Sequence, residues 1–291
     1  MTQSSEATPT LRVALVQQPA SQDKAENVAR GLSALETAAR AGAHVVAYAE
    51  LAFEPFYPQR RLDSGEGGFP VDLAETIPGP TTEAFCRKAR ELGVVVVLNL
   101  YERAGDLAYD SSPVIDADGS LLGLTRMMHI CDYEGFFERG YYAPGDTGAP
   151  VYETAVGRIG VAICYDRHHP EYLRALALKK PDVVVVPQAG AIGEWPEGLF
   201  EAELRVAAFQ NGFFTALVNR VGAEEALTFN GGSFVCDPAG RVVARAGATA
   251  EILYADLDRS LLGASAGRRL FLPDRRPELY PDLLGSQEGA E

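Results

Sequence analysis

Short apolar runs alternate with helical periodicity at the start of the chain. The segment TLRVALVQQPA (10–20) is a β-branched apolar run, which predicts a buried strand. Apolar residues then recur at helical spacing, at Val28, Leu32, Leu35 and Ala39, and Gly42 precedes a second apolar run, AHVVAYAE (43–50). This order predicts a β-α-β unit, and the unbroken apolar strands indicate a parallel sheet covered by helices.

The same order returns in the second half of the chain. GRIGVAICYD (157–166) predicts a strand, PEYLRALALKK (170–180) a helix that Pro170 opens, and DVVVVPQAG (182–190) another strand. Two hairpins, each with a DxxG turn, fall at 112–126 and 232–247. We therefore expect an α/β fold of two similar halves, with two sheets packed face to face between two helical layers. One domain is predicted over 1–291, with a core at about 10–260 and a C-terminal arm at 261–291.

Composition and charge narrow the functional classes. The chain has 291 residues, 47% hydrophobic and 23% charged, which is typical of a globular protein. No apolar run approaches the ~18 residues of a membrane helix, and MTQSSEATPT lacks the features of a signal peptide. A net charge of −14 argues against nucleic acid as a partner. Four cysteines without CxxC spacing favour free thiols in a cytoplasmic protein.

Cys164 follows an apolar strand and precedes a helix. This strand–turn–helix order presents a side chain near a helix N-terminus, where backbone N–H groups can lower a thiol pKa and bind an oxyanion. The pattern equally fits a buried core cysteine. Cys86 and Cys236 fall within predicted elements and are interpreted as structural, while Cys131, in a loop, is a weaker candidate nucleophile.

Two glutamates stand beside apolar and aromatic residues. Glu50 ends a buried strand, where α/β proteins bind ligands, and such surroundings raise a carboxyl pKa towards that of a general base. Glu138 lies among Phe136, Phe137, Tyr141 and Tyr142. Both residues also fit a role without chemistry: Glu50 as a charged residue where the strand reaches solvent, and Glu138 as a solvated charge in a loop. No third ligand accompanies the histidines near Cys164 at a metal-site spacing, so we expect no metal, and we expect no organic cofactor.

Taken together, these segments resemble the nitrilase superfamily of carbon–nitrogen hydrolases, nearest the N-carbamoyl amide hydrolases. The resemblance runs from VALVQQPA (13–20) through FFERGYYAPGD (136–146), ICYDRHHPEYLRALAL (163–178) and AAFQNGFFTALVNRVGAE (207–224) to DRRPELY (274–280). It implies a four-layer α-β-β-α sandwich, no cofactor and a Glu–Lys–Cys triad with a second glutamate.

The resemblance assigns roles to individual residues. Glu50 matches the general base, Cys164 the nucleophile and Glu138 the second glutamate. The N–H of Tyr165, which follows the nucleophile, is a candidate oxyanion donor. The lysine position, two residues before a histidine, holds Met127, whose side chain has no charge and no proton to donate.

Three explanations for Met127 remain open. In the first, another cation replaces the lysine, and Arg126, His129 and Arg167 are nearest in sequence. Adjacent residues of a strand face opposite sides, so Arg126 is disfavoured, and His129 shares the parity of Met127 if the strand extends that far. Alternatively, the substrate is activated and needs less help, or the fold binds a ligand without turnover.

The substrate is less clearly indicated. In the similar carbamoyl hydrolases, the positions of Arg167 and His168 face a substrate carboxylate, which suggests an N-carbamoyl amino acid or another acidic amide. Pairing of Arg167 with Asp166 or Glu171 is the alternative. Trp195 either covers the pocket or only packs against neighbouring side chains. The resemblance also implies a homodimer or higher homo-oligomer, and we expect no membrane partner.

Overall fold

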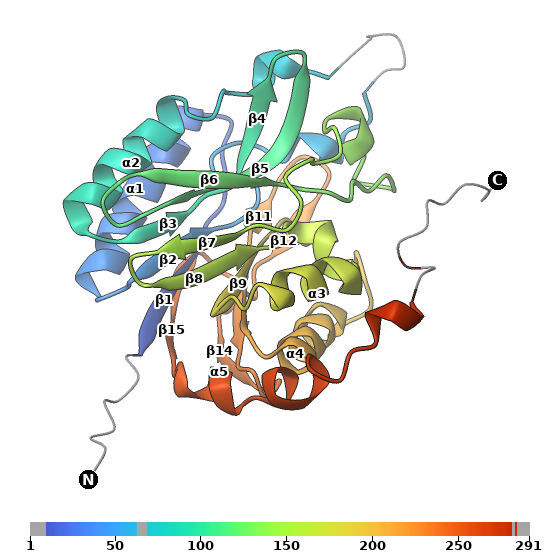
Figure 1. Ribbon diagram of the computed structural model, residues 1–291. Coiled ribbons are helices and arrows are strands. Elements are labelled where there is room, and N and C mark those ends of the chain that lie inside the picture. Colours follow the sequence, from blue (N-terminus) through green and yellow to red (C-terminus); the bar gives the residue numbers. More distant parts are fainter. Residues whose placement is uncertain (1–9, 63–68, 281–282, 284–291) are drawn as a thin grey trace, which may run out of the picture.

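Both β-α-β units predicted from the sequence are present. The computed structural model describes residues 10–62, 69–280 and 283 (Figure 1). Strands β1 (Leu11–Gln17) and β2 (Val45–Tyr48) are parallel neighbours joined by α1 (Lys24–Arg40). Strands β8 (Gly157–Val161) and β9 (Val183–Gln188) are joined in the same way by α3 (Pro170–Leu178), which Pro170 opens.

The first sheet has seven strands. Its order is β15-β1-β2-β3-β5-β4. Strand β5 pairs with β4 through residues 107–111 and with β6 through residues 111–115. The further strands are β3 (Val95–Val97), β4 (Leu100–Ala104), β5 (Leu107–Ile115), β6 (Leu121–Arg126) and β15 (Glu251–Leu257). Helices α1 and α2 (Pro80–Leu92) pack on its outer face through an apolar cluster that includes Leu35, Phe85 and Ala89.

The second sheet has six strands in the order β14-β13-β10-β9-β8-β7. Its further strands are β7 (Val151–Thr154), β10 (Phe214–Asn219), β13 (Phe234–Cys236) and β14 (Val242–Arg245). Helices α3 and α4 (Leu199–Asn211) cover its outer face through Leu173, Leu176 and Leu204. A separate ribbon pairs β11 (Val221–Ala223) with β12 (Thr228–Asn230).

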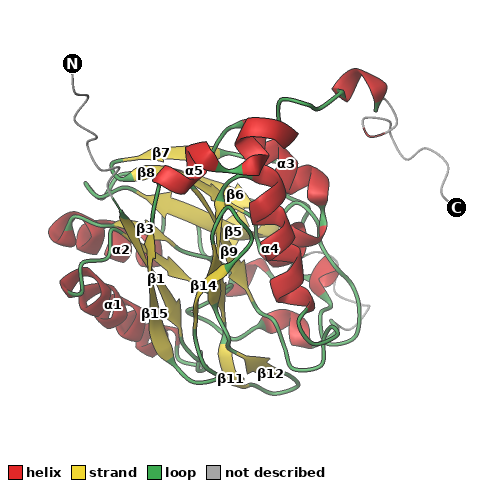
Figure 2. Ribbon diagram, turned by 90° about the horizontal axis from the view of Figure 1, so that it is seen from below, coloured by secondary structure: helices red, strands yellow, loops and turns green. Residues whose placement is uncertain are grey.

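The two sheets pack face to face, and Figure 2 shows helices on both outer sides. The largest apolar cluster lies between them and takes residues from both, including Val13, Val97, Val161 and Val185. The four-layer α-β-β-α sandwich predicted from the sequence is therefore confirmed. Alternating apolar runs and helices produce it because strands buried on both faces need apolar side chains throughout.

Several shorter features complete the fold. The DxxG turns close as predicted, with Gly119 N–H bonded to Asp116 O and Gly240 N–H to Asp237 O. The single-turn helices are η1 (Tyr57–Gln59), η2 (Val71–Leu73), η3 (Glu138–Gly140), η4 (Cys164–His168), α5 (Ser260–Ala264), the π-turn η5 (Gly267–Phe271) and η6 (Pro277–Leu279). Within the predicted C-terminal arm, η5 packs on α4, and most of 281–291 lies outside the described residues. Of the described helices, none has the length and apolar character needed to cross a membrane.

Candidate active site

Glu50 lies just beyond β2, at the carboxyl end of the parallel strands. Its side chain is fully buried. The next residue, Leu51, has a left-handed backbone (φ 45°), and its N–H donates to Asn99 Oδ1 at 2.7 Å. The buried Arg220 guanidinium donates to Glu50 O at 2.9 Å and also to Leu51 O. A strained turn of this kind persists only where its surroundings hold it, and here two buried polar side chains do so.

Cys164 opens η4 after β8, at the corresponding edge of the second sheet. Its backbone is also left-handed (φ 36°), and its side chain is buried. Arg167, one turn later and only 3% exposed, donates through Nη1 to Cys164 O at 2.8 Å and to Cys164 Sγ at 3.7 Å. The sulfur therefore lies next to a buried positive charge that the same short turn supplies.

The thiol pKa differs from the sequence-based expectation. Burial raises the pKa of Cys164 well above its usual range, and the nearby Glu50 carboxyl raises it further, whereas the charge of Arg167 lowers it. The expected lowering by a helix N-terminus is wrong because one short turn and one arginine do not outweigh the loss of solvation. The direction of this shift favours the neutral thiol over the thiolate.

Glu50 and Glu138 provide buried carboxyl groups beside this thiol. Burial, and then the charge of Glu138, raise the pKa of Glu50 to about 8, while the neighbouring Cys164 and Asp110 side chains and the charge of Arg220 oppose the shift. Burial also raises the pKa of Glu138 to about 8, with Cys131 N–H donating to its Oε2 at 3.4 Å. The fold thus brings Glu50, Glu138 and Cys164 together from three distant segments.

Met127 lies immediately after β6, which ends at Arg126. Its N–H donates to Asp110 O at 2.9 Å and its carbonyl accepts from Gly145 N–H at 2.8 Å. Its side chain, 1% exposed, belongs to the apolar cluster between the sheets, as does Cys164. The position that the resemblance reserves for a lysine therefore points into the buried site but contributes no charge.

The three candidate cations fall in different places. Arg126 faces away from Met127, as the strand parity predicts, and pairs with Glu102 at 2.6 Å. β6 ends before His129, so the parity argument does not apply to it, and its Nδ1 lies 2.7 Å from Asp166 Oδ1. Of the three, Arg167 is the one in contact with the Cys164 sulfur.

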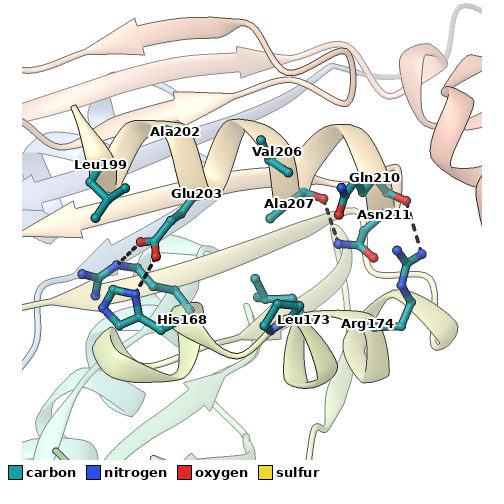
Figure 3. A pocket seen from close by; sticks show the side chains of 12 residues that line it. His168, Leu173, Arg174, Leu199, Ala202, Glu203, Val206, Ala207, Gln210 and Asn211 are labelled. Atoms are coloured by element: carbon teal, nitrogen blue, oxygen red, sulfur yellow. Dashed lines mark hydrogen bonds and ion pairs between the residues drawn. The ribbon is translucent and has the colours of Figure 1, made fainter. Parts of the chain in front are cut away.

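Arg167 and His168 share a partner that the sequence did not suggest. Glu203 of α4 lies 3.3 Å from Arg167 Nε and 2.5 Å from His168 Nδ1 (Figure 3). The alternative of pairing with Asp166 or Glu171 is therefore wrong: a helix distant in sequence supplies the carboxylate. The groove between α3 and α4 that these residues line has a volume of about 370 Å³.

A second cavity lies over Tyr165, the residue after the nucleophile. Its volume is about 590 Å³, and its lining consists of Phe69, His129, Ile130, Arg139, Tyr142, Pro144, Tyr165 and His169. Tyr165 is the second residue of η4, and the first N–H groups of a helix lack an intrahelical acceptor. Trp195 lies outside this cavity, 36% exposed, with its ring edge-on to Tyr133 and His168.

Sequence reasoning missed two buried residues of the site. Asp110 lies within β5 and Arg220 directly after β10, and both are at most 1% exposed. Each is a charged residue in or after an apolar run, the same signal that singled out Glu50. Among the residues that the structure describes, no three His, Cys, Asp or Glu side chains are grouped to hold a metal ion.

Comparisons with known proteins agree with this geometry. The profile of the carbon–nitrogen hydrolase family matches residues 12–266. N-carbamoylputrescine amidase of Solanum lycopersicum is 36% identical, over 94% of each chain, and citrullinase of Francisella tularensis is 31% identical, over 94% of this chain and 98% of its own. The crystal structure of a carbon–nitrogen hydrolase from Helicobacter pylori superposes with a TM-score of 0.87 and 30% identity, over 95% of this chain and 99% of the other.

Proposed function

This chain belongs to the carbon–nitrogen hydrolase family and is an enzyme of that class, and from this premise we propose that it hydrolyses an N-carbamoyl compound or amide through a thioester on Cys164. The observation that carries the proposal is the burial of Glu50, Glu138 and Cys164 in one site, built from both sheets. Because both sheets contribute, we treat the chain as a single functional domain.

The proposed reaction begins with proton transfer. Glu50 takes the proton of the Cys164 thiol as the sulfur attacks the amide or ureido carbon, since the raised thiol pKa disfavours a resting thiolate. The N–H of Tyr165 stabilises the developing oxyanion. Ammonia leaves with the proton that Glu50 returns, and water, activated by the same carboxylate, hydrolyses the thioester. Glu138 supports this site as the second carboxyl group.

We assign to Arg167 the electrostatic role that a lysine has in the similar enzymes. Its Nη1 atom is 3.7 Å from the sulfur, and the contact with Cys164 O fixes it there. Its guanidinium supplies a positive charge next to the sulfur, as the lysine ammonium does in the similar enzymes. Met127 therefore leaves the site without a lysine but not without a cation.

The substrate proposal rests on the cavity over Tyr165. Arg139 lines it as a cation, so its wall suits an acidic group at the far end of the substrate, and the rings of His129 and His169 line it as well. Arg167 and His168 are instead engaged by Glu203. The names of two relatives refer to ureido compounds, N-carbamoylputrescine and citrulline. An N-carbamoyl amino acid is accordingly our first choice, ahead of a simple carboxamide.

The decisive experiment is intact-protein mass spectrometry with a panel of N-carbamoyl amino acids, N-carbamoyl amines, carboxamides and nitriles. Ammonia release is followed in parallel. We expect a substrate-sized adduct and ammonia from the wild type and from Cys131→Ala, the matched control for a neighbouring buried thiol. Cys164→Ala should give neither. Ammonia release that survives in Cys164→Ala would refute the thioester mechanism.

The alternative is a chain that binds its ligand with impaired or no turnover. The raised pKa of Cys164 and the uncharged Met127 favour it. Silence of the wild type across the panel, with turnover restored in Met127→Lys, would identify the missing lysine as the defect. Silence of both proteins, with ligand binding retained in calorimetry, would support the binding role.

We also propose a homodimer or higher homo-oligomer. The groove between α3 and α4 exposes apolar side chains, among them Leu199 and Val206, at 36% and 51% exposure (Figure 3). Covering such a surface is favourable because it removes apolar area from water. Light scattering at micromolar concentration should report at least a dimer, and a monomer would refute this proposal.

A further inference from the structure

Asp110 is a buried acid at the centre of the candidate site. It lies in β5, one residue before Ser111, which pairs with Arg126, and the N–H of Met127 donates to its carbonyl, so the antiparallel register continues one residue beyond β6 and places Met127 opposite Asp110. Side chains opposite one another in an antiparallel ladder project to the same face. The Asp110 carboxyl group, fully buried, is therefore next to the position where a lysine is missing.

Asn99 fixes how the Asp110 carboxyl group is used. The Leu51 N–H donates to Asn99 Oδ1 at 2.7 Å, so the amide nitrogen of Asn99 must point the other way. That nitrogen donates to Asp110 Oδ1 at 2.5 Å and to Ser112 Oγ at 3.1 Å. Asp110 Oδ2 receives no hydrogen bond from any described residue. One oxygen of Asp110 thus accepts a bond, and the other is available to carry a proton.

Glu50 needs the donor that Asp110 can supply. No N–H or O–H of the described residues donates to either carboxyl oxygen of Glu50. The Glu50 and Asp110 side chains lie within hydrogen-bonding reach of each other. Two ionised carboxylates are both acceptors and repel, so this contact is a hydrogen bond only if one of them holds a proton.

We propose that Asp110 keeps a proton and donates it in a hydrogen bond to ionised Glu50, so that Asp110 is a positioning residue for the general base. This inference rests on the proposed hydrolase function of Glu50. Because Asn99 donates to Oδ1, the proton lies on Oδ2. Asp110 rather than Glu50 holds it because their contact raises the pKa of Asp110 and lowers that of Glu50, which outweighs the opposing hydrogen bond from Asn99. A neutral acid therefore does part of the work of the absent lysine: it orients Glu50 without adding a charge.

The groups that face Asp110 favour a retained proton. Burial comes first among the causes that raise its pKa well above the usual range, followed by the charge of Glu50. The titratable groups around it come from several elements and are largely acidic: Glu50, Glu138, Tyr142 and Asp166. The nearby Arg220 donates mainly to backbone carbonyls of the Glu50 turn and pairs with Glu224.

The pair predicts a bell-shaped pH profile. Below the Glu50 pKa of about 8 both carboxyl groups are protonated and the base is absent. Above it, Glu50 is ionised while Asp110 still donates, which is the working state. At higher pH Asp110 also ionises and repels Glu50, so activity falls again. Interacting carboxyls titrate as a pair, and the two limbs belong to the pair rather than to either residue.

The first test does not depend on turnover. Protein labelled with ¹³C at the aspartate carboxyl is examined by infrared difference spectroscopy about one pH unit above the Glu50 pKa of about 8. We expect a protonated-carboxyl band that shifts with the aspartate label and is absent from Asp110→Asn. A correctly folded wild type without such a band would overturn the inference and would leave the hydrolase proposal intact.

The second test compares two variants by alkylation of Cys164 with chloroacetamide, followed by mass spectrometry across pH. Asn at 110 keeps a neutral N–H donor to Glu50, so Asp110→Asn should stay within a few-fold of the wild type and lose the alkaline decline. Asp110→Leu should be slower by about 10- to 100-fold, as for loss of a hydrogen bond to a charged group. Asp106→Asn, an exposed turn residue, is the matched control. Equal losses in Asp110→Asn and Asp110→Leu would overturn the proposed role.

Discussion

Replacing Arg167 tests whether its charge supports the nucleophile. Nη1 lies 3.7 Å from Cys164 Sγ, and at an effective dielectric constant near 20 two charges at this separation attract by about 4 kcal/mol. Conversion at 1.36 kcal/mol per pKa unit gives ~3 units as the largest increase in the Cys164 pKa when the charge is removed. Arg167→Gln keeps a polar side chain but no charge. We therefore expect ~10²–10³-fold slower acylation, comparable to the loss of one oxyanion donor.

The assay is the rate of Cys164 alkylation by chloroacetamide, with ammonia release measured on the best substrate. Arg126→Gln, which alters the ion pair with Glu102, is the matched arginine control and should react like the wild type. The double variant Arg167→Gln/Glu203→Gln removes both members of a buried pair and tests whether an uncompensated Glu203 causes the loss.

If the charge of Arg167 supports the nucleophile, Cys164 should be alkylated slowly in both Arg167→Gln and the double variant. Circular dichroism and thermal unfolding should resemble those of the wild type in at least the double variant. Wild-type alkylation in a folded Arg167→Gln would show that the 3.7 Å contact has no electrostatic role. Full recovery in the double variant would assign the defect to Glu203 instead.

Three further predictions concern the carboxyl groups. First, kcat/KM should rise with pH through about 8, because burial raises the Glu50 pKa and only the ionised carboxylate accepts a proton. Glu50→Gln should be inactive at every pH. A wild-type profile that is already flat at pH 6 would contradict this assignment. Second, Met127→Lys should move the acidic limb of the kcat/KM profile at least one pH unit lower, because an ammonium next to Glu50 and Asp110 favours their ionised forms. The control Met127→Leu should leave the limb unchanged. An unchanged limb in Met127→Lys would place residue 127 away from the pair. Third, urea unfolding should show stability decreasing as pH rises from about 4.5 to about 8, because folded Glu50 and Glu138 keep protons that the unfolded chain releases. Glu50→Gln removes the Glu50 part of this dependence, worth at most ~5 kcal/mol, and equal slopes in both proteins would refute it.

The layer order of the fold could be read from the sequence because it depends on local patterns. Unbroken apolar runs such as 43–50 predict strands buried on both faces, and the DxxG turns predict hairpins, with no knowledge of distant contacts. The apolar series of α1 packs on the core as predicted: Leu35 is fully buried, and Val28, Leu32 and Ala39 are partly buried against it. The buried positions that the series did not include are Asn27, Gly31 and Ala38. A glycine and an asparagine are buried there because Phe53 packs close to Gly31 and the Asn27 amide donates to Phe53 O.

The site was predictable only where chemistry and strand position coincide. Glu50 and Cys164 each follow a strand, so their convergence at one edge could be expected. The partner of Arg167 could not, because Glu203 comes from α4, 36 residues further along the chain. The thiol pKa was also misjudged, since its sign depends on complete burial, which sequence does not report. Asp110 gave the signal of an acid in an apolar strand, but its meaning needs Asn99 and Glu50 in three dimensions.

Met127 has a consequence that follows from charge balance. Removing a lysine from a buried site leaves its carboxylates without a counter-charge, and an isolated buried charge is costly enough that the group takes up a proton instead. Here Glu50, Glu138 and Asp110 all have raised pKa values, with burial the largest cause in each. Protons therefore neutralise these carboxyl groups, while Arg167 supplies the positive charge next to the sulfur. If Glu50 is the general base, as proposed, we expect Met127 to move the working range towards alkaline pH rather than to abolish catalysis, because Glu50 becomes a base once its own proton has left.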